Sequence, residues 1–337
     1  MKIQNAILPI LLIGGVAGPQ IRAASIEVYA FTVAGQSSCP TFGPTDQVRN
    51  AIQVSSIEAS TPGAGCGVTQ DLQDFTAAGG NLTASSTASG GGNTSFGSYT
   101  YTGSSRSRAG FNGLGVEALG SLTGATDGFS TGSSDAFGEF TDGFTVPGAN
   151  GQSGYLQVNY TIDGTQTITG RGYTTLELLW RANGGPQYST FRAADGTAGG
   201  GASVNINGTY VNSGPGITIT GNEIDVNTSQ SFLVPVTFNQ KTDLQVILYG
   251  SAVPGPSTGN AFPSAVDNGF YNTVSFTGFE VLDSNLNPIN GAQVLRDSAA
   301  VPEPSTVLLV VIGLGVVYLG FRRSAAAARP WRLSNRA

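Results

Sequence analysis

The chain has 337 residues, of which 49 are Gly and only 11% are charged, and its formal net charge is −6. Because it contains no His, the sequence excludes His-activated Ser or Cys nucleophiles, imidazole bases and His-ligated metals. An isoelectric point near 4.6 argues against nucleic acid as a partner. Low charge with abundant Gly, Ser and Thr is typical of a turn-rich, all-β secreted domain.

Residues 1–25 have the outline of a secretory signal peptide. Lys2 is charged, an apolar run extends from Ala6 to Ala17, and the small residues Ala23-Ala24-Ser25 follow. The run is too short to favour a membrane-spanning helix. The alternative is a buried N-terminal strand or helix. We expect signal peptidase to cleave after Ala24 or Ser25, which leaves residues 26–300 as an exported ectodomain.

The ectodomain is expected to be an antiparallel β-sandwich. Strands with alternating apolar residues are predicted at 155–162 and 232–238, and further strands at 140–146, 176–180 and 244–248. One apolar face per strand requires two sheets that pack against each other. The connecting segments are less regular. We place turns at 163–164 and 239–242, a proline-containing loop at 251–264, and either an edge hairpin or a loop at 77–92.

The C-terminal segment reads as a membrane helix with a basic tail. Val307–Phe321 is apolar apart from Tyr318, and about 1.5 Å per residue gives these 15 residues a length of roughly 22 Å. We therefore expect a transmembrane helix at 306–321, with Arg322 and Arg323 extending it by snorkelling. The positive-inside rule keeps the Arg-containing tail, 324–337, in the cytoplasm. The alternative, a buried core helix, does not explain the basic tail.

The sequence Val-Pro-Glu-Pro-Ser-Thr at 301–306, followed by the short apolar helix and the Arg pair, resembles the PEP-CTERM protein-sorting signal of Gram-negative bacteria. The resemblance covers 301–323. It implies that the precursor is anchored in the inner membrane and that a membrane-embedded exosortase cuts it near Pro302, Glu303 and Pro304. The mature protein then passes to the cell surface or the medium. The resemblance also implies association with exopolysaccharide or biofilm.

The ectodomain itself resembles a β-sandwich found upstream of this signal. The stretches that carry the resemblance are 134–151, 155–164, 232–249 and 265–294. They imply a jelly-roll-like fold and no particular activity.

The two cysteines, Cys39 and Cys66, suggest one disulfide in an exported chain. The alternatives are two separate buried thiols, or a redox or metal pair. Without His, two Cys cannot complete a zinc site.

The acidic residues Asp127, Asp135, Glu139 and Asp142 cluster beside Gly turns, and such oxygen ligands suit calcium. Their spacing fits no calcium motif, and the plainer interpretation is solvent-facing turn and strand residues. We therefore expect no metal or other cofactor, with calcium kept as an alternative.

Catalytic residues are not singled out by the sequence. A glycosidase needs only two carboxylates, but no pair stands out, and Lys241 lies in a predicted exposed turn rather than beside a Ser nucleophile. Several aromatic side chains are candidates for a sugar-binding groove, although most are expected in the core: Tyr99, Tyr101, Phe111, Tyr155, Trp180, Tyr188 and Tyr210.

These observations favour an exported, exosortase-processed surface or matrix protein that is not an enzyme. Its expected partners are signal peptidase, exosortase and an exopolysaccharide, and the membrane before processing. The alternative is a carbohydrate-binding module or a polysaccharide-acting enzyme on the same β-sandwich scaffold.

Overall fold

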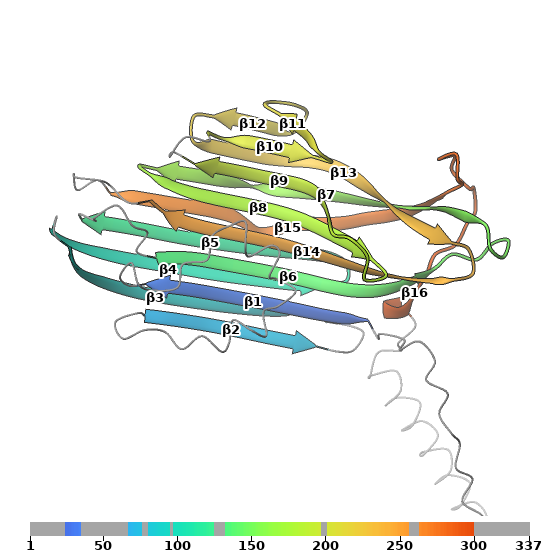
Figure 1. Ribbon diagram of the computed structural model, residues 1–337, viewed down its shortest axis with the longest axis horizontal. Coiled ribbons are helices and arrows are strands. Elements are labelled where there is room, and N and C mark those ends of the chain that lie inside the picture. Colours follow the sequence, from blue (N-terminus) through green and yellow to red (C-terminus); the bar gives the residue numbers. More distant parts are fainter. Residues whose placement is uncertain are drawn as a thin grey trace, which may run out of the picture.

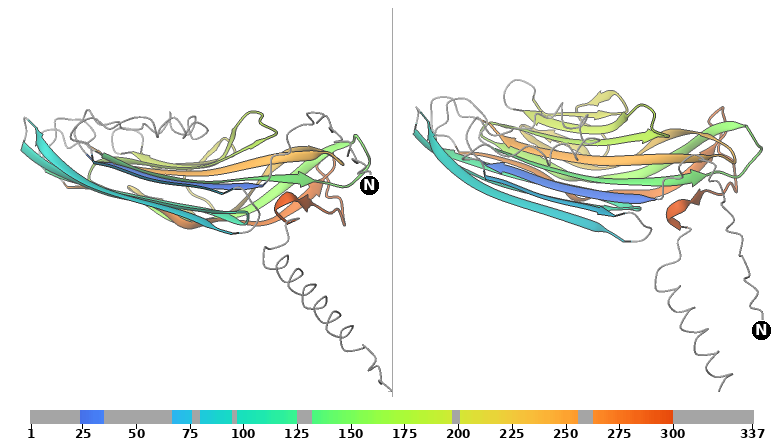
Figure 2. Two further views of the ribbon diagram at one scale, coloured as in Figure 1. Left: turned by 90° about the horizontal axis from the view of Figure 1, so that it is seen from below. Right: turned by 60° about the horizontal axis from the view of Figure 1, so that its bottom comes forward.

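The computed structural model describes residues 24–34, 67–75, 80–94, 97–124, 132–196, 201–255 and 263–299. These residues form two antiparallel sheets whose strands run along the long axis of the molecule (Figure 1). The sheets lie face to face as two curved layers (Figure 2). The predicted antiparallel β-sandwich is therefore confirmed.

The larger sheet has the order β11-β10-β9-β8-β14-β6-β1-β2, and the short strand β16 pairs with β6. Its strands are β1 (Ser25–Ala34), β2 (Gly67–Phe75), β6 (Gly132–Thr145), β8 (Gly172–Ala182), β9 (Tyr188–Gly196), β10 (Ser203–Ile206), β11 (Thr209–Val211), β14 (Lys241–Pro254) and β16 (Leu295–Arg296).

The smaller sheet has the order β12-β13-β7-β15-β5-β4-β3. Its strands are β3 (Leu82–Thr94), β4 (Gly97–Gly110), β5 (Gly113–Gly124), β7 (Ser153–Thr169), β12 (Ile217–Thr220), β13 (Glu223–Thr237) and β15 (Ser264–Leu282). A short 3-10 helix, η2 (Asp297–Ala299), follows β16. From β5 onward the chain crosses between the sheets several times, which is the jelly-roll-like behaviour expected from the sequence.

The core lies between the sheets and follows directly from the alternation of apolar residues. In β7, Leu156, Val158, Tyr160 and Ile162 are all fully buried, whereas the residues between them are half-buried. Aromatic rings from opposite sheets meet edge to face, with the centroids of Phe140 and Phe276 separated by 5.1 Å. These period-two patterns position every other side chain of a strand on the outer face.

The expected turn at 163–164 is wrong. Strand β7 runs through both residues to Thr169, and Gly164 pairs with Val226 of β13. A Cβ atom at Gly164 would lie 2.5 Å from the ring of Phe270, so glycine here permits close packing of that ring. The chain turns instead at Gly170, whose φ of 79° suits a residue without a side chain.

The other connections differ in detail from the expectation. The turn after β13 ends at Gln240, so Lys241 and Thr242 belong to β14, and the two strands lie in different sheets. Residues 251–254 continue β14 rather than forming a loop. Of the segment 77–92, residues 82–92 belong to β3, which forms the edge of the smaller sheet and pairs antiparallel with β4, as expected for the edge hairpin.

The two expected targeting segments lie largely or wholly outside the described residues. Of the signal peptide, only Ala24 and Ser25 are described, and Ser25 already pairs with Thr141 as the first residue of β1. Cleavage after Ala24 would therefore leave β1 intact. The expected helix at 306–321 falls beyond residue 299; among the residues with described placement, no helix is long and apolar enough to cross a membrane.

Candidate functional site

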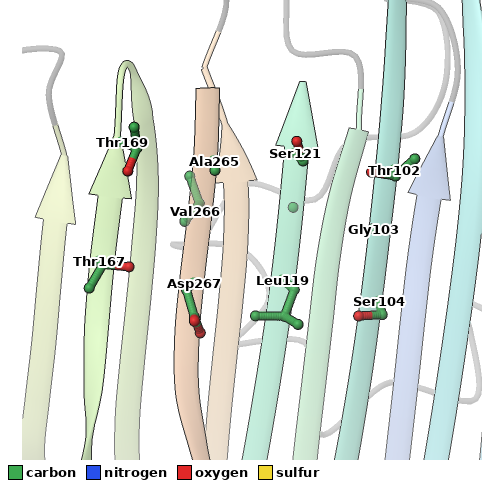
Figure 3. Close-up of a pocket in the computed structure, with 11 residues that line it drawn as sticks. Thr102, Gly103, Ser104, Leu119, Ser121, Thr167, Thr169, Ala265, Val266 and Asp267 are labelled. Atoms are coloured by element: carbon green, nitrogen blue, oxygen red, sulfur yellow. The ribbon is translucent and has the colours of Figure 1, made fainter. Parts of the chain in front are cut away.

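The outer face of the smaller sheet carries a depression of about 430 Å³ that crosses strands β4, β5, β15 and β7. Figure 3 shows its labelled side chains on these adjacent strands. Alternation explains its chemistry, because core residues such as Val116 and Ala118 face inward while their neighbours face outward. The outward positions supply five hydroxyl groups, an aliphatic side chain and one carboxylate: Thr102, Ser104, Leu119, Ser121, Thr167, Thr169 and Asp267.

The carboxyl group of Asp267 is the one ionisable group of this lining. Its Oδ1 atom is buried and has no hydrogen-bond partner. Burial raises the pKa of Asp267, and the negative charge of Glu117 raises it further. The register explains this proximity, since Glu117 of β5 lies opposite Gly269, two residues along β15 from Asp267.

An ion pair flanks the depression on the same face. Arg106 donates to both carboxylate oxygens of Glu117, with its Nε at 2.8 Å from Oε1 and its Nη2 at 2.6 Å from Oε2. The Arg106 guanidinium also lies 4.2 Å from the centroid of the Tyr271 ring. Glu117 is therefore held by Arg106, two residues along the ladder from the level of Asp267.

This arrangement can bind a hydroxylated ligand. Hydroxyl groups both donate and accept hydrogen bonds, the carboxylate accepts them, and Leu119 offers an apolar surface for C–H groups. The lining includes no Lys or Arg, so it has no cation to attract an anionic group.

A second distinctive site is the junction at 295–299, where the described chain ends. Asp142 of β6 is fully buried and lies on the same face of its strand as the core residues Phe140 and Phe144. Its Oδ2 accepts from Arg296 Nε at 2.9 Å and from Ser298 Oγ at 2.6 Å, while its Oδ1 accepts from the Ser298 amide at 3.0 Å. One buried carboxylate thus holds both β16 and η2.

Further contacts fix the same junction. Arg296 Nη2 donates to the Phe111 carbonyl at 3.0 Å, and the guanidinium lies 5.1 Å from the centroid of the Phe279 ring. Lys241 pairs with Asp297 at 2.7 Å. The junction is therefore anchored by charge, hydrogen bonds and ring contacts from the β4–β5 turn, β6, β14 and β15 together.

The acidic residues considered for calcium do not form one site. Asp135 and Glu139 lie on the outer face of β6, where Asp135 accepts from the Tyr249 hydroxyl at 2.8 Å and Glu139 accepts from Gln245. Asp142 faces inward and binds Arg296, and Asp127 lies outside the described residues. None of the three described residues is in a solvent-facing turn, because β6 runs through them all.

The remaining predicted site residues are similarly dispersed. Tyr99, Tyr101, Phe111 and Trp180 are buried, and Tyr155 is half-buried on β7 of the smaller sheet. Tyr188 and Tyr210 are exposed on β9 and β11 of the larger sheet. Of these seven, the structure stacks Trp180 on Tyr188, with ring centroids 4.8 Å apart. Lys241 is the first residue of β14, not part of the expected turn, and it forms ion pairs with Asp243 and Asp297. Cys39, Cys66, Pro302, Glu303, Pro304, Arg322 and Arg323 lie outside the described residues.

Sequence reasoning missed the residues that the structure brings together. Arg106, Glu117 and Asp267 each occupy an outward position of an alternating strand, but their strands become neighbours only through the sheet order. Within the described ranges, no three acidic or Cys side chains gather closely enough to hold a metal ion.

A comparison with families of known proteins bears on the chain's destination. Residues 300–324 match the PEP-CTERM protein-sorting motif, which confirms the resemblance over 301–323. No curated protein matches the chain. The motif marks an exported protein that exosortase processes, and it begins directly after the anchored junction. It does not bear on what the β-sandwich binds.

Proposed function

We propose that this protein is a non-enzymatic component of the cell surface or extracellular matrix that binds exopolysaccharide after export. Signal peptidase and exosortase are its processing enzymes, and the membrane holds only the precursor. The sorting motif at 300–324 carries the export part of this proposal, and it directly follows the docked junction at 295–299.

The depression on the smaller sheet supports a polysaccharide as the ligand. Its hydroxyl-rich lining matches the hydroxyl groups of a sugar chain, and its open position on a sheet face can accommodate an extended polymer. Segment 26–304 carries 8 basic and 21 acidic residues, a formal charge of 8 − 21 = −13. This charge disfavours an anionic polysaccharide, so the proposed ligand is a neutral one.

Binding of purified matrix polysaccharide from the producing cells tests the proposal. The Leu119→Arg variant places a long charged side chain in the depression without altering the core face of β5. Ser229→Arg is the charge-matched control, because Ser229 is exposed on β13 of the same sheet and outside the lining. We expect Leu119→Arg to weaken binding at least tenfold and Ser229→Arg to leave it unchanged. Equal binding by both variants and the wild type would contradict the proposed site.

The non-enzymatic role has its own test. The wild type is incubated with the same polysaccharide, and newly formed reducing ends are measured. We expect none above background. Reducing ends that appear with the wild type but not with Glu117→Gln or Asp267→Asn would instead identify these two carboxylates as a hydrolytic pair.

A further inference from the structure

Four side-chain oxygen atoms that accept no hydrogen bond from another side chain lie buried between the two sheets. They are Gln166 Oε1, Asn268 Oδ1 and both carboxylate oxygens of Asp195. Gln166 and Asn268 are 0% exposed and Asp195 is 1% exposed. Such atoms are costly inside a protein unless something satisfies them.

The register places these side chains at one level of the sandwich. Gln166 of β7 and Asn268 of β15 are direct cross-strand partners in the smaller sheet. Asp195 of β9 is on the facing sheet, where it pairs with Thr174 of β8. Asp195 follows Phe191 and Ala193 along the inward face of its strand, so its carboxylate shares the inter-sheet space with the two amides.

Hydrogen bonds across the gap link the two amide side chains of the smaller sheet to strands of the larger sheet near Asp195. Gln166 Nε2 donates to the Ala193 carbonyl at 3.4 Å, two residues from Asp195. Asn268 Nδ2 donates to the carbonyls of Thr175 and Ser251, the latter at 3.2 Å. Both amide nitrogens therefore bind the opposite sheet, and this orientation leaves both amide oxygens as acceptors within the sandwich.

No side-chain donor serves these oxygens among the described residues. The Thr174 hydroxyl donates to the Ser251 carbonyl at 3.0 Å, so it offers only its oxygen lone pairs to Asp195. Burial raises the pKa of Asp195, and only the backbone amide of Gly196 opposes this shift. The cluster is thus composed of acceptors that need a cation or a proton.

We propose that Asp195, Gln166, Asn268 and Thr174 bind one calcium ion between the sheets. Five oxygens from four strands supply most of the six to eight ligands that calcium takes, in the flexible geometry that it tolerates. The set contains no nitrogen or sulfur ligand, which disfavours zinc and copper. Magnesium requires a near-ideal octahedron with shorter bonds, and four side chains fixed by separate strands are poorly suited to that.

Calcium binding is tested on the full-length protein purified in detergent, by thermal unfolding with calcium chloride or with a chelator. For a chain of this size, calcium at one hundred times its dissociation constant is expected to raise the Tm by about 5 °C or more. The variant Asp195→Asn should lose this increase and should unfold no lower than the wild type in the chelator, because it removes a buried unpaired charge. Asp225→Asn, at an exposed position of β13, is the matched control and should keep the full response.

Equilibrium dialysis with radioactive calcium gives a second readout that does not depend on stability. We expect about one ion per wild-type and Asp225→Asn molecule, and none on Asp195→Asn. A wild-type Tm that calcium does not change would overturn the proposal, and so would equal numbers of bound ions on all three proteins. Either result would mean that Asp195 is held in the protonated form instead of binding calcium. A response to magnesium as large as that to calcium would overturn the choice of ion.

Discussion

The anchored junction allows one stability prediction to be developed in detail. Truncating Arg296 to Ala removes the guanidinium that pairs with Asp142, together with its bond to the Phe111 carbonyl. It also removes contacts with two aromatic rings, at 5.5 Å for Phe144 and 5.1 Å for Phe279. The carboxylate of Asp142, which is 0% exposed, stays behind with Ser298 as its remaining partner.

The size of the effect follows from burial. Breaking a buried ion pair by removing one partner costs about 3–5 kcal/mol. The Arg296 side chain is 17% exposed and Ser298 still donates to the carboxylate, so we expect the lower end, about 3 kcal/mol. The comparison is Arg106→Ala, which breaks a pair with Glu117 that is shorter, at 2.6 Å, than the 2.9 Å pair of Arg296. Because the Arg106 side chain is 48% exposed, solvent screening limits that loss to about 0.5 kcal/mol.

Urea unfolding followed by far-ultraviolet circular dichroism measures both losses under the same conditions. Arg296→Ala should shift the midpoint markedly, and Arg106→Ala should barely shift it. If the two variants lose the same free energy of unfolding, or if Arg296→Ala loses less than about 1 kcal/mol, the junction is not held by a buried pair and the reasoning fails.

Three further predictions concern the core, the sorting signal and alkaline stability. Val236→Asp places an unpaired charge between the sheets and should abolish folding, whereas Ser229→Asp on the same strand should fold normally, as circular dichroism will show. Replacing residues 302–304 by alanines should leave export intact but retain the protein in the inner membrane; its normal release on cell fractionation would contradict exosortase processing. Burial raises the pKa of Tyr160 to about 12, above the value near 10 of an unfolded chain, so stability should hold below pH 10 and fall as the pH rises through 12. Urea midpoints that stay constant between pH 9 and 12 would contradict this.

Alternation of apolar residues predicted the strands well because burial on one face is a strong and local constraint. The segment 155–162 lies within β7 as expected, and 232–238 lies within β13 except for Phe238, which begins the turn after it. The Asp163-Gly164 pair misled the prediction, since a dipeptide typical of turns can also sit in a long strand. Here pairing with β13 and the close Phe270 ring outweigh the local turn preference.

The functional features depend on contacts that no local pattern reveals. Asp142 and Arg296 are separated by 154 positions, so nothing near either residue predicts their pairing. The depression draws its lining from four strands between 102 and 267, and only the sheet order makes them neighbours. The sorting motif, by contrast, is one continuous segment that an enzyme reads locally, and the sequence alone identified it.

The mass of the mature protein in fractionated cells tests the central claim most directly. The account predicts a polypeptide that begins at Ser25 or Ile26, ends near residues 302–304, and is found at the cell surface or in the medium. An intact chain of 34.3 kDa, dissolved in the cytosol and carrying both termini, would contradict it.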